Sequence, residues 1–130
     1  MAKIHARIEQ AHYKTTLTTA TNQLIADEPT DSGGEDLGFS PSELLAAALG
    51  TCTAVTLRMY ADRRNMPLDN VDVDVTFERD AAQNTSAIHR TITLTGNLTE
   101  EQRQKLLHIA NQCFIHKTLS NPIVISTELV

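Results

Sequence analysis

Residues 40–53 decide the fold, and they read Ser-Pro-Ser-Glu-Leu-Leu-Ala-Ala-Ala-Leu-Gly-Thr-Cys-Thr. Ser40 and Glu43 have the spacing of a capping box, in which each side chain accepts a hydrogen bond from the backbone of the other residue. Pro41 fits the first helical position, where its missing N–H costs nothing. The sequence therefore predicts that a helix begins here.

This helix is expected to be long and central. Its apolar residues recur every three or four positions, Arg63 and Arg64 suit its negative C-terminal end, and Pro67 stops it. At 1.5 Å per residue the helix is roughly 35 Å long. Its middle, residues 46–54, consists almost entirely of small residues, so another element can approach its backbone closely.

Three short strands are expected before the helix. Apolar and polar residues alternate over residues 4–9 and again over 13–19, and residues 22–26 can add a third strand. The segments between them leave room only for tight connections, so the strands should form an antiparallel meander. Residues 27–39 are acidic and rich in Pro and Gly, which predicts a mobile loop. Such a loop either covers a site or is a solvated connector, and the sequence leaves both readings open.

The second half of the chain repeats this mixture of strands and helices. Val71 to Glu78 alternates as a strand with one wet face, and Thr99 to Gln102 forms a second capping box. The remaining expected segments are a turn over 80–85, a strand over 88–94, a helix up to Cys113, a short turn or helix over 114–121, and a last strand over 123–130. The order β-β-β-α-β-β-α-β predicts one α+β domain over residues 1–130, with helices packed on a strongly bent antiparallel sheet.

Composition and charge exclude several classes of protein. The net charge of −5 argues against nucleic acid as a partner, because binding phosphates requires a basic face. Residues 1–10 do not resemble a secretory signal, and the apolar run over 44–57 is interrupted and too short to span a bilayer. The five histidines show no metal-ligand spacing, so we expect neither a metal site nor a cofactor. These features predict a cytoplasmic protein.

The two cysteines, Cys52 and Cys113, are the candidate reactive groups. A permanent disulfide is not expected in the cytoplasm. Cys52 lies on the apolar stripe of the long helix, which by itself is typical of a small buried side chain. Cys113 ends the second predicted helix, where unpaired carbonyls disfavour a thiolate, but His116 and Lys117 follow it and cations favour one.

At this point the motifs carry a resemblance. Residues 40–53, followed by Leu-Arg-Met-Tyr-Ala at 57–61, resemble the core helix of the OsmC-like family, which includes the organic hydroperoxide resistance proteins. The segment Ala-Asn-Gln-Cys-Phe-Ile-His-Lys-Thr-Leu at 110–119 resembles the family's second cysteine segment. The independently predicted order of elements also fits, so the resemblance extends over most of the chain.

The resemblance implies an architecture and a reaction. Members of this family are intertwined homodimers whose long helices lie back to back, with two active sites at the interface. Cys52 would be the peroxidatic thiol that becomes a sulfenic acid, and Cys113 the resolving thiol that closes a disulfide with it. An organic hydroperoxide would be the substrate, and an external dithiol, such as a lipoylated protein, would reset the pair. The expected role is defence against oxidative stress.

The sequence departs from the family pattern at two places. The hydroperoxide-reducing branches have a Glu ten residues before the helix cysteine, working with an N-terminal Arg, whereas this chain has Ser42 there. Glu43, one residue later, is the candidate for an acidic partner, but it lies about 100° further around the helix, and we favour its explanation as the third residue of the capping box. Arg7 is the only N-terminal arginine, and nothing in its pattern assigns it to the site. Phe114 stands where many relatives have Pro.

Three readings therefore remain open. The first is a cysteine-based hydroperoxide reductase that uses Cys52 and Cys113. The second is a slow redox sensor or ligand-binding protein of the same fold, which lacks the acidic partner of the peroxidase branches. The third is a structural domain with two inert thiols. The pKa of Cys52 separates them, since thiolate character controls reactivity.

Overall fold

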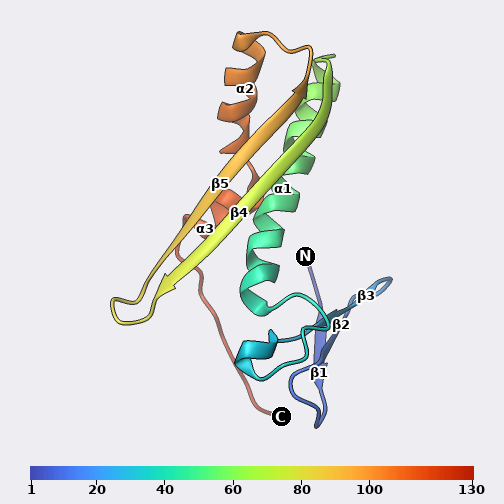
Figure 1. Cartoon of the computed structure of the whole chain (residues 1–130), viewed down its shortest axis with the longest axis vertical. Coiled ribbons are helices and arrows are strands. Elements are labelled where there is room, and N and C mark those ends of the chain that lie inside the picture. The colour runs from blue at the N-terminus through green and yellow to red at the C-terminus, as the bar shows by residue number, and fades with distance from the viewer. The chain divides into compact units, whose positions relative to one another are not determined.

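The computed structural model describes all residues from 1 to 130 (Figure 1). Its elements in chain order are β1 (His5–Ile8), β2 (Thr15–Thr18), β3 (Gln23–Ala26), the 3-10 helix η1 (Thr30–Ser32), α1 (Pro41–Arg63), β4 (Leu68–Asp80), β5 (Thr85–Gly96), α2 (Glu100–Ala110) and α3 (Phe114–Leu119). They divide into two compact units, Met1–Leu45 and Ala46–Val130. The α+β class is confirmed, with two antiparallel sheets in place of one bent sheet. The single domain over 1–130 stays a prediction.

The first unit is the predicted antiparallel meander. Strand β2 lies between β1 and β3, and Leu17 pairs with Ala6 on one side and with Leu24 on the other. The alternation seen in the sequence therefore predicted these strands correctly. Both Ile8 and Leu24 remain exposed in the protomer, so the small sheet lacks a complete apolar cover.

The loop after β3 is not the structureless segment predicted from its composition. It contains η1, and it is organised around the buried carboxylate of Asp27. That carboxylate accepts four backbone N–H hydrogen bonds, from Tyr13 at 3.0 Å, Glu28 at 2.7 Å, Glu35 at 3.3 Å and Leu37 at 3.1 Å. Burial tends to raise the pKa of Asp27, but these donors outweigh it and the pKa lies below its usual value. The loop's role as a lid stays a prediction.

Helix α1 begins and ends as the sequence predicts. The Ser40 N–H donates to Glu43 Oε1 at 2.9 Å, and the Glu43 N–H donates to Ser40 Oγ at 3.2 Å. These two bonds form the predicted capping box. At the other end Asn65 has a φ of 53°, and the Met66 N–H returns to the Ala61 carbonyl at 2.9 Å. This left-handed residue closes the helix before Pro67.

The second unit is a long two-stranded ribbon with helices packed against it. Figure 1 shows α1 and α2 on the same side of β4 and β5. The buried core comes from both helices and the start of β4: Leu57, Ala61, Leu68, Leu106 and Ala110. A Cβ atom on Gly50 would lie 3.4 Å from Val75 Cγ2. The small middle of α1 therefore does allow a close approach of β4, as predicted.

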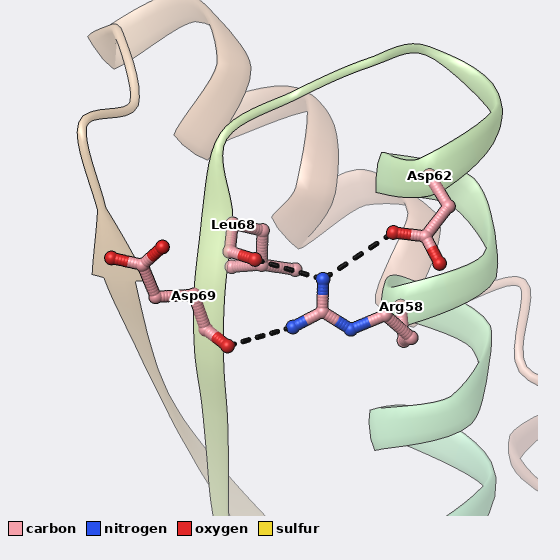
Figure 2. A network of polar contacts seen from close by, with 4 residues as sticks. All are labelled: Arg58, Asp62, Leu68 and Asp69. Atoms are coloured by element: carbon pink, nitrogen blue, oxygen red, sulfur yellow. Dashed lines mark hydrogen bonds and ion pairs between the residues drawn. The ribbon is translucent and has the colours of Figure 1, made fainter.

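Arg58 fastens α1 to the beginning of β4 (Figure 2). The ladder between β4 and β5 is irregular between Leu68 and Asn70. The carbonyls of Leu68 and Asp69 accept hydrogen bonds from the Arg58 guanidinium, both at 2.8 Å, and Asp62 lies 3.4 Å from the same group. The arginine thus supplies donors where the strand pairing is disturbed.

The C-terminal part confirms one prediction and contradicts another. Thr99 and Gln102 form the predicted capping box of α2, and the uncertain segment after Cys113 is the short helix α3. The predicted last strand over 123–130 is wrong, because these residues form no ladder with β1–β5. Their alternating apolar pattern favours a strand, but a strand requires a partner and no strand of this chain pairs with them.

Helix α1 is longer than the apolar run over 44–57 that the sequence marked as too short to span a bilayer. By length and composition its 23 residues could cross a membrane. The core helix of a soluble protein meets the same criterion, and one such helix is weak evidence for a membrane protein. Because α1 contributes Leu57 and Ala61 to the packed core, we interpret it as a core helix.

Candidate active site at the cysteine pair

The fold brings the two cysteines together. Cys52 is half-buried in the middle of α1, and Cys113 is completely buried between α2 and α3. Their thiols lie within hydrogen-bonding contact, and both are free. The turn after α2 makes this possible, because the Cys113 N–H returns to the Ala110 carbonyl at 3.3 Å and the next residue begins α3.

The surroundings of Cys52 favour its thiolate. Burial by itself raises the pKa, but four hydrogen-bond donors lower it to below the usual cysteine value. These donors are the Cys113 thiol, the backbone N–H of Ile115, the Thr56 hydroxyl and the backbone N–H of Phe114. Donors to a charged sulfur stabilise that charge, so Cys52 is the more acidic thiol of the pair.

Cys113 has the opposite tendency. Burial and the hydrogen bond to Cys52 both raise its pKa, and the backbone N–H groups of His116 and Ile115 offset this only in part. The sequence suggested that Cys113 faces the carbonyls at the end of a helix, whereas the structure places it at the N-cap of α3. The arrangement therefore places the more acidic thiol, Cys52, beside the less acidic thiol, Cys113, and the more acidic one is the better candidate nucleophile.

The residue that sequence reasoning missed is Arg90. Its guanidinium donates to Thr53 Oγ1 at 2.9 Å, the Ala110 carbonyl at 3.3 Å and Asn111 Oδ1 at 3.0 Å, and it lies 3.2 Å from His116 Nδ1. The sequence did contain a signal. Arg90 occupies a half-buried position on the alternating face of β5, where its neighbours on that face are Ile88 and Ile92. A charge on an otherwise apolar strand face requires buried partners.

The structure places His116 beside Arg90, with Nδ1 of the imidazole against the guanidinium. The expectation that His116 supplies a cation beside the thiol stays a prediction. Lys117, the other expected cation, is exposed on α3.

The remaining predicted site residues have structural contacts of their own. The Glu43 carboxylate accepts the Ser40 N–H in the capping box, and this residue belongs to the other unit from Cys52. Its part as an acidic partner stays a prediction. Arg7 forms an exposed ion pair with Glu9 at 3.6 Å. Phe114 has an exposed side chain, but its backbone N–H is one of the donors to Cys52, a donor that Pro cannot provide.

The chain is similar to a known family and to several solved structures. The sequence model described as "OsmC-like protein" matches residues 33–128. A Psychrobacter arcticus protein assigned to the osmotic stress and detoxification response is 23% identical, with a TM-score of 0.78 over 91% of this chain and 88% of that one. An OsmC-like protein from Mycoplasma pneumoniae is 18% identical, with a TM-score of 0.77 over 91% and 86% of the two chains.

A third similar structure belongs to a protein named for resistance to organic hydroperoxides. The organic hydroperoxide resistance protein OhrB of Bacillus subtilis is 23% identical, with a TM-score of 0.62 over 91% of this chain and 89% of that one. A comparison with curated protein sequences finds no match for this chain. At these identities the solved structures establish the fold, and the two contacting thiols remain the feature from which chemistry must be argued.

Proposed function

Because this chain belongs to the OsmC-like protein family, we propose that it is a thiol-dependent peroxidase that reduces organic hydroperoxides in defence against peroxide stress. The observation that carries the proposal is the contact between Cys52 and Cys113, with the pKa of the first lowered and that of the second raised. Two thiols with opposite shifts suit two different roles, the more acidic one as the attacking nucleophile and the less acidic one as the resolving thiol.

The first step consumes the peroxide. The Cys52 thiolate attacks the terminal hydroxyl oxygen of R–O–OH, the O–O bond breaks, and Cys52 becomes a sulfenic acid while an alkoxide leaves. The alkoxide takes up one proton to give the alcohol. Solvent supplies this proton. During the step the Cys113 thiol stays protonated and donates a hydrogen bond to the Cys52 sulfur, which is the atom that is oxidised.

The second step restores the resting enzyme in two exchanges. Cys113 attacks the Cys52 sulfur, a disulfide forms, and the hydroxyl leaves as water together with the Cys113 proton. Because the thiols are already in contact, this closure needs little rearrangement. An external dithiol then reduces the disulfide through a mixed disulfide and is itself oxidised. A lipoylated protein is the reductant we propose from the family resemblance.

The substrate class follows from the relatives and from the site. The Bacillus subtilis relative is named for resistance to organic hydroperoxides. In this chain Cys52 lies on the largely apolar middle of α1, between Leu49 and Val55. An apolar surround favours a substrate with a carbon substituent over hydrogen peroxide. We place the protein in the cytoplasm, where dithiol reductants keep such a pair in its reduced form.

We also propose that the working form is a homodimer. The protomer exposes 9934 Å² of surface. A compact monomer of this mass exposes about 6,800 Å², and even two separate compact units of these lengths would expose about 8,100 Å² in total. The chain therefore exposes about 1,800 Å² more than two separate compact units would. Each protomer of an obligate homodimer buries an area of this order in its interface.

Peroxide consumption by the purified protein tests the enzyme directly. Cumene hydroperoxide, tert-butyl hydroperoxide and hydrogen peroxide would be compared, with dithiothreitol or dihydrolipoamide as reductant. We expect turnover on the two organic peroxides, loss of turnover in Cys52→Ser and, in Cys113→Ser without reductant, one equivalent of peroxide consumed with no disulfide formed. Undiminished consumption by a folded Cys52→Ser protein would exclude the proposal.

One observation favours a second candidate, a slow redox sensor on the same fold. Ser42 replaces the acidic residue of the peroxidase branches, and Glu43 is engaged by the helix cap. A sensor would form the Cys52–Cys113 disulfide when treated with oxidant, but no dithiol would sustain rapid turnover. The same assay therefore distinguishes the two functions, because both predict the disulfide and only the enzyme predicts repeated consumption of peroxide.

A further inference from the structure

Arg90 connects the two segments that carry the cysteines. It projects from β5 and reaches three helical regions: Thr53 on α1, the C-terminal end of α2 at Ala110 and Asn111, and His116 on α3. Every one of these partners lies within three residues of Cys52 or Cys113. All belong to the second compact unit, Ala46–Val130.

On the Cys52 side, the hydrogen bond between Arg90 and the Thr53 hydroxyl has a defined direction. Thr53 is completely buried and follows Cys52 directly. Its hydroxyl donates to the Leu49 carbonyl at 2.7 Å, so its oxygen is free to accept from Arg90 at 2.9 Å. A buried hydroxyl with both roles satisfied has no alternative partner of equal energy. Arg90 therefore fixes the turn of α1 on which Cys52 is placed.

The contacts on the other side enclose Cys113. Ala110 and Asn111 precede Cys113 and His116 follows it. One guanidinium therefore contacts the turn between α2 and α3 on both sides of Cys113. The planar fork of an arginine suits this task, because its donors have fixed directions relative to one another. Lysine would place a single point charge there and could not hold three elements at once.

The causes that shift the pKa values of the two thiols come from groups other than the Arg90 guanidinium. The groups that lower the pKa of Cys52 are the Cys113 thiol, two backbone N–H groups and a hydroxyl. Two of these donors, the N–H groups of Phe114 and Ile115, belong to the segment that Arg90 holds. The arginine thus acts on the sulfurs through the position of that segment.

We propose that Arg90 is the positioning residue for disulfide closure, holding the turn that carries Cys113 against the turn of α1 that carries Cys52. The inference rests on the proposed cysteine pair, but it does not depend on peroxide being the oxidant. Any reagent that attaches a good leaving group to the Cys52 sulfur prepares that sulfur for the same second step, the attack by Cys113.

Ellman's reagent, a bis(nitrobenzoate) disulfide, allows that step to be followed alone. The exposed edge of Cys52 attacks it, one thionitrobenzoate leaves, and Cys52 carries the other as a mixed disulfide. Cys113 then attacks the Cys52 sulfur, gives up its proton to solvent and releases the second thionitrobenzoate. Stopped-flow absorbance separates the two releases, and Cys113→Ser, which should release only the first, identifies the slow phase.

The decisive variant is Arg90→Met, with Arg103→Met as its matched control. Arg103 is also half-buried and also ties a helix to β5, through the carbonyls of Leu94 at 3.0 Å and Gly96 at 3.3 Å, but it contacts neither cysteine segment. We expect Arg90→Met to slow the second release by about tenfold or more, since small misplacements of reacting atoms carry large rate penalties. Arg103→Met should close at the wild-type rate. Equal rates in all three proteins, or equal slowing in both variants, would overturn the proposal.

Two further measurements keep the test sharp if Arg90→Met folds poorly. Thr53→Val removes the acceptor on α1 at nearly constant volume and should slow closure, whereas Thr53→Ser keeps the hydroxyl and should not. Normal closure in Thr53→Val, or equal slowing in Thr53→Val and Thr53→Ser, would remove the basis of the assignment.

Discussion

At the scale of single residues, the backbone N–H of Phe114 has a testable effect on Cys52. Phe114→Pro removes that donor alone, and the site tolerates proline: it is the first residue of α3, and Cys113 before it is extended at φ −54° and ψ 133°. We expect the pKa of Cys52 to rise in this variant, because one donor to the thiolate is lost. The pH dependence of alkylation by iodoacetamide measures it.

The control for that substitution is Phe114→Ala, which removes the same exposed ring and keeps the N–H. The alanine variant should alkylate with the wild-type pH profile. If alanine shifts the profile as far as proline does, the ring and not the backbone donor is responsible. The comparison also shows how a chain with Phe at this position differs from relatives with Pro.

Asp27 gives a second prediction at this scale, on stability against pH. Its two carboxylate oxygens accept four backbone N–H groups, so Asp27→Asn would turn an NH₂ group toward two of these donors and destabilise the loop. Because the folded pKa lies below the ordinary value of 3.8, the ionised group stabilises the fold above that value. This contribution is lost as the pH falls through the lowered pKa.

Urea unfolding measured from neutral pH downward checks both parts of this expectation. Asp27→Asn should be less stable than wild type at neutral pH, and the difference should shrink in acid. Asp31 lies in the same loop with an exposed side chain, so Asp31→Asn is the matched control and should follow the wild-type curve. A constant difference at every pH would contradict the role of the Asp27 charge.

At the scale of elements, the junction between α1 and β4 depends on Arg58 (Figure 2). Its bonds to the carbonyls of Leu68 and Asp69 are both 2.8 Å long, and they lie where the register of the ladder shifts. Its ion pair with Asp62 is exposed and 3.4 Å long. Arg58→Met should therefore cost about 1–3 kcal/mol in unfolding free energy, because charged hydrogen bonds to carbonyls are lost.

Asp62→Asn separates the two kinds of contact. An exposed i,i+4 ion pair contributes only about 0.3–0.5 kcal/mol, so this variant should unfold close to wild type. Equilibrium unfolding in urea measures both proteins. If Asp62→Asn costs as much as Arg58→Met, the ion pair and not the two carbonyl contacts fastens the helix to the strand.

The elements themselves were largely predictable from local signals. Both capping boxes, the alternation of β4 and β5 and the small middle of α1 are local properties, and each is present where the sequence indicated it. The strand predicted over 123–130 failed because a strand depends on a partner elsewhere. For the same reason the spacing of 61 residues between Cys52 and Cys113 could not reveal their contact, and only the family resemblance anticipated it.

The contacts of Arg90 could not be predicted from the sequence either, because they also join segments that are far apart along the chain. Its strand position was recognised, but its partners lie on α1, α2 and α3, between 20 and 37 residues away in the sequence. A charged residue among inward-facing apolar ones indicates that buried partners exist without naming them. Sequence reasoning could thus have marked Arg90 as unusual, while its four contacts required the fold.

At the scale of the whole molecule, the excess exposed surface leads to a prediction about assembly. Val55 and Met59 are adjacent on one face of α1 and are 45% and 53% exposed, and the apolar tail over 123–125 pairs with no strand of this protomer. Exposed apolar groups of this kind are costly in a monomer and typical of an interface. We expect sedimentation equilibrium to give twice the protomer mass of 14.3 kDa at micromolar concentration.

A charge on the exposed face of α1 tests whether that face is the interface. Met59→Asp places an unpaired carboxylate in a contact that would have to be desolvated, so the dimer should dissociate or weaken strongly. Met59→Leu keeps the apolar surface and should stay dimeric. A wild-type protein that sediments as a monomer would contradict the assembly, whereas a dimer unaffected by Met59→Asp would move the interface to other exposed apolar residues, such as those of the first unit. Because Cys52 lies on the same helix, loss of the dimer with loss of peroxide turnover would connect assembly to catalysis, and a fully active monomer would show that one protomer holds a complete site.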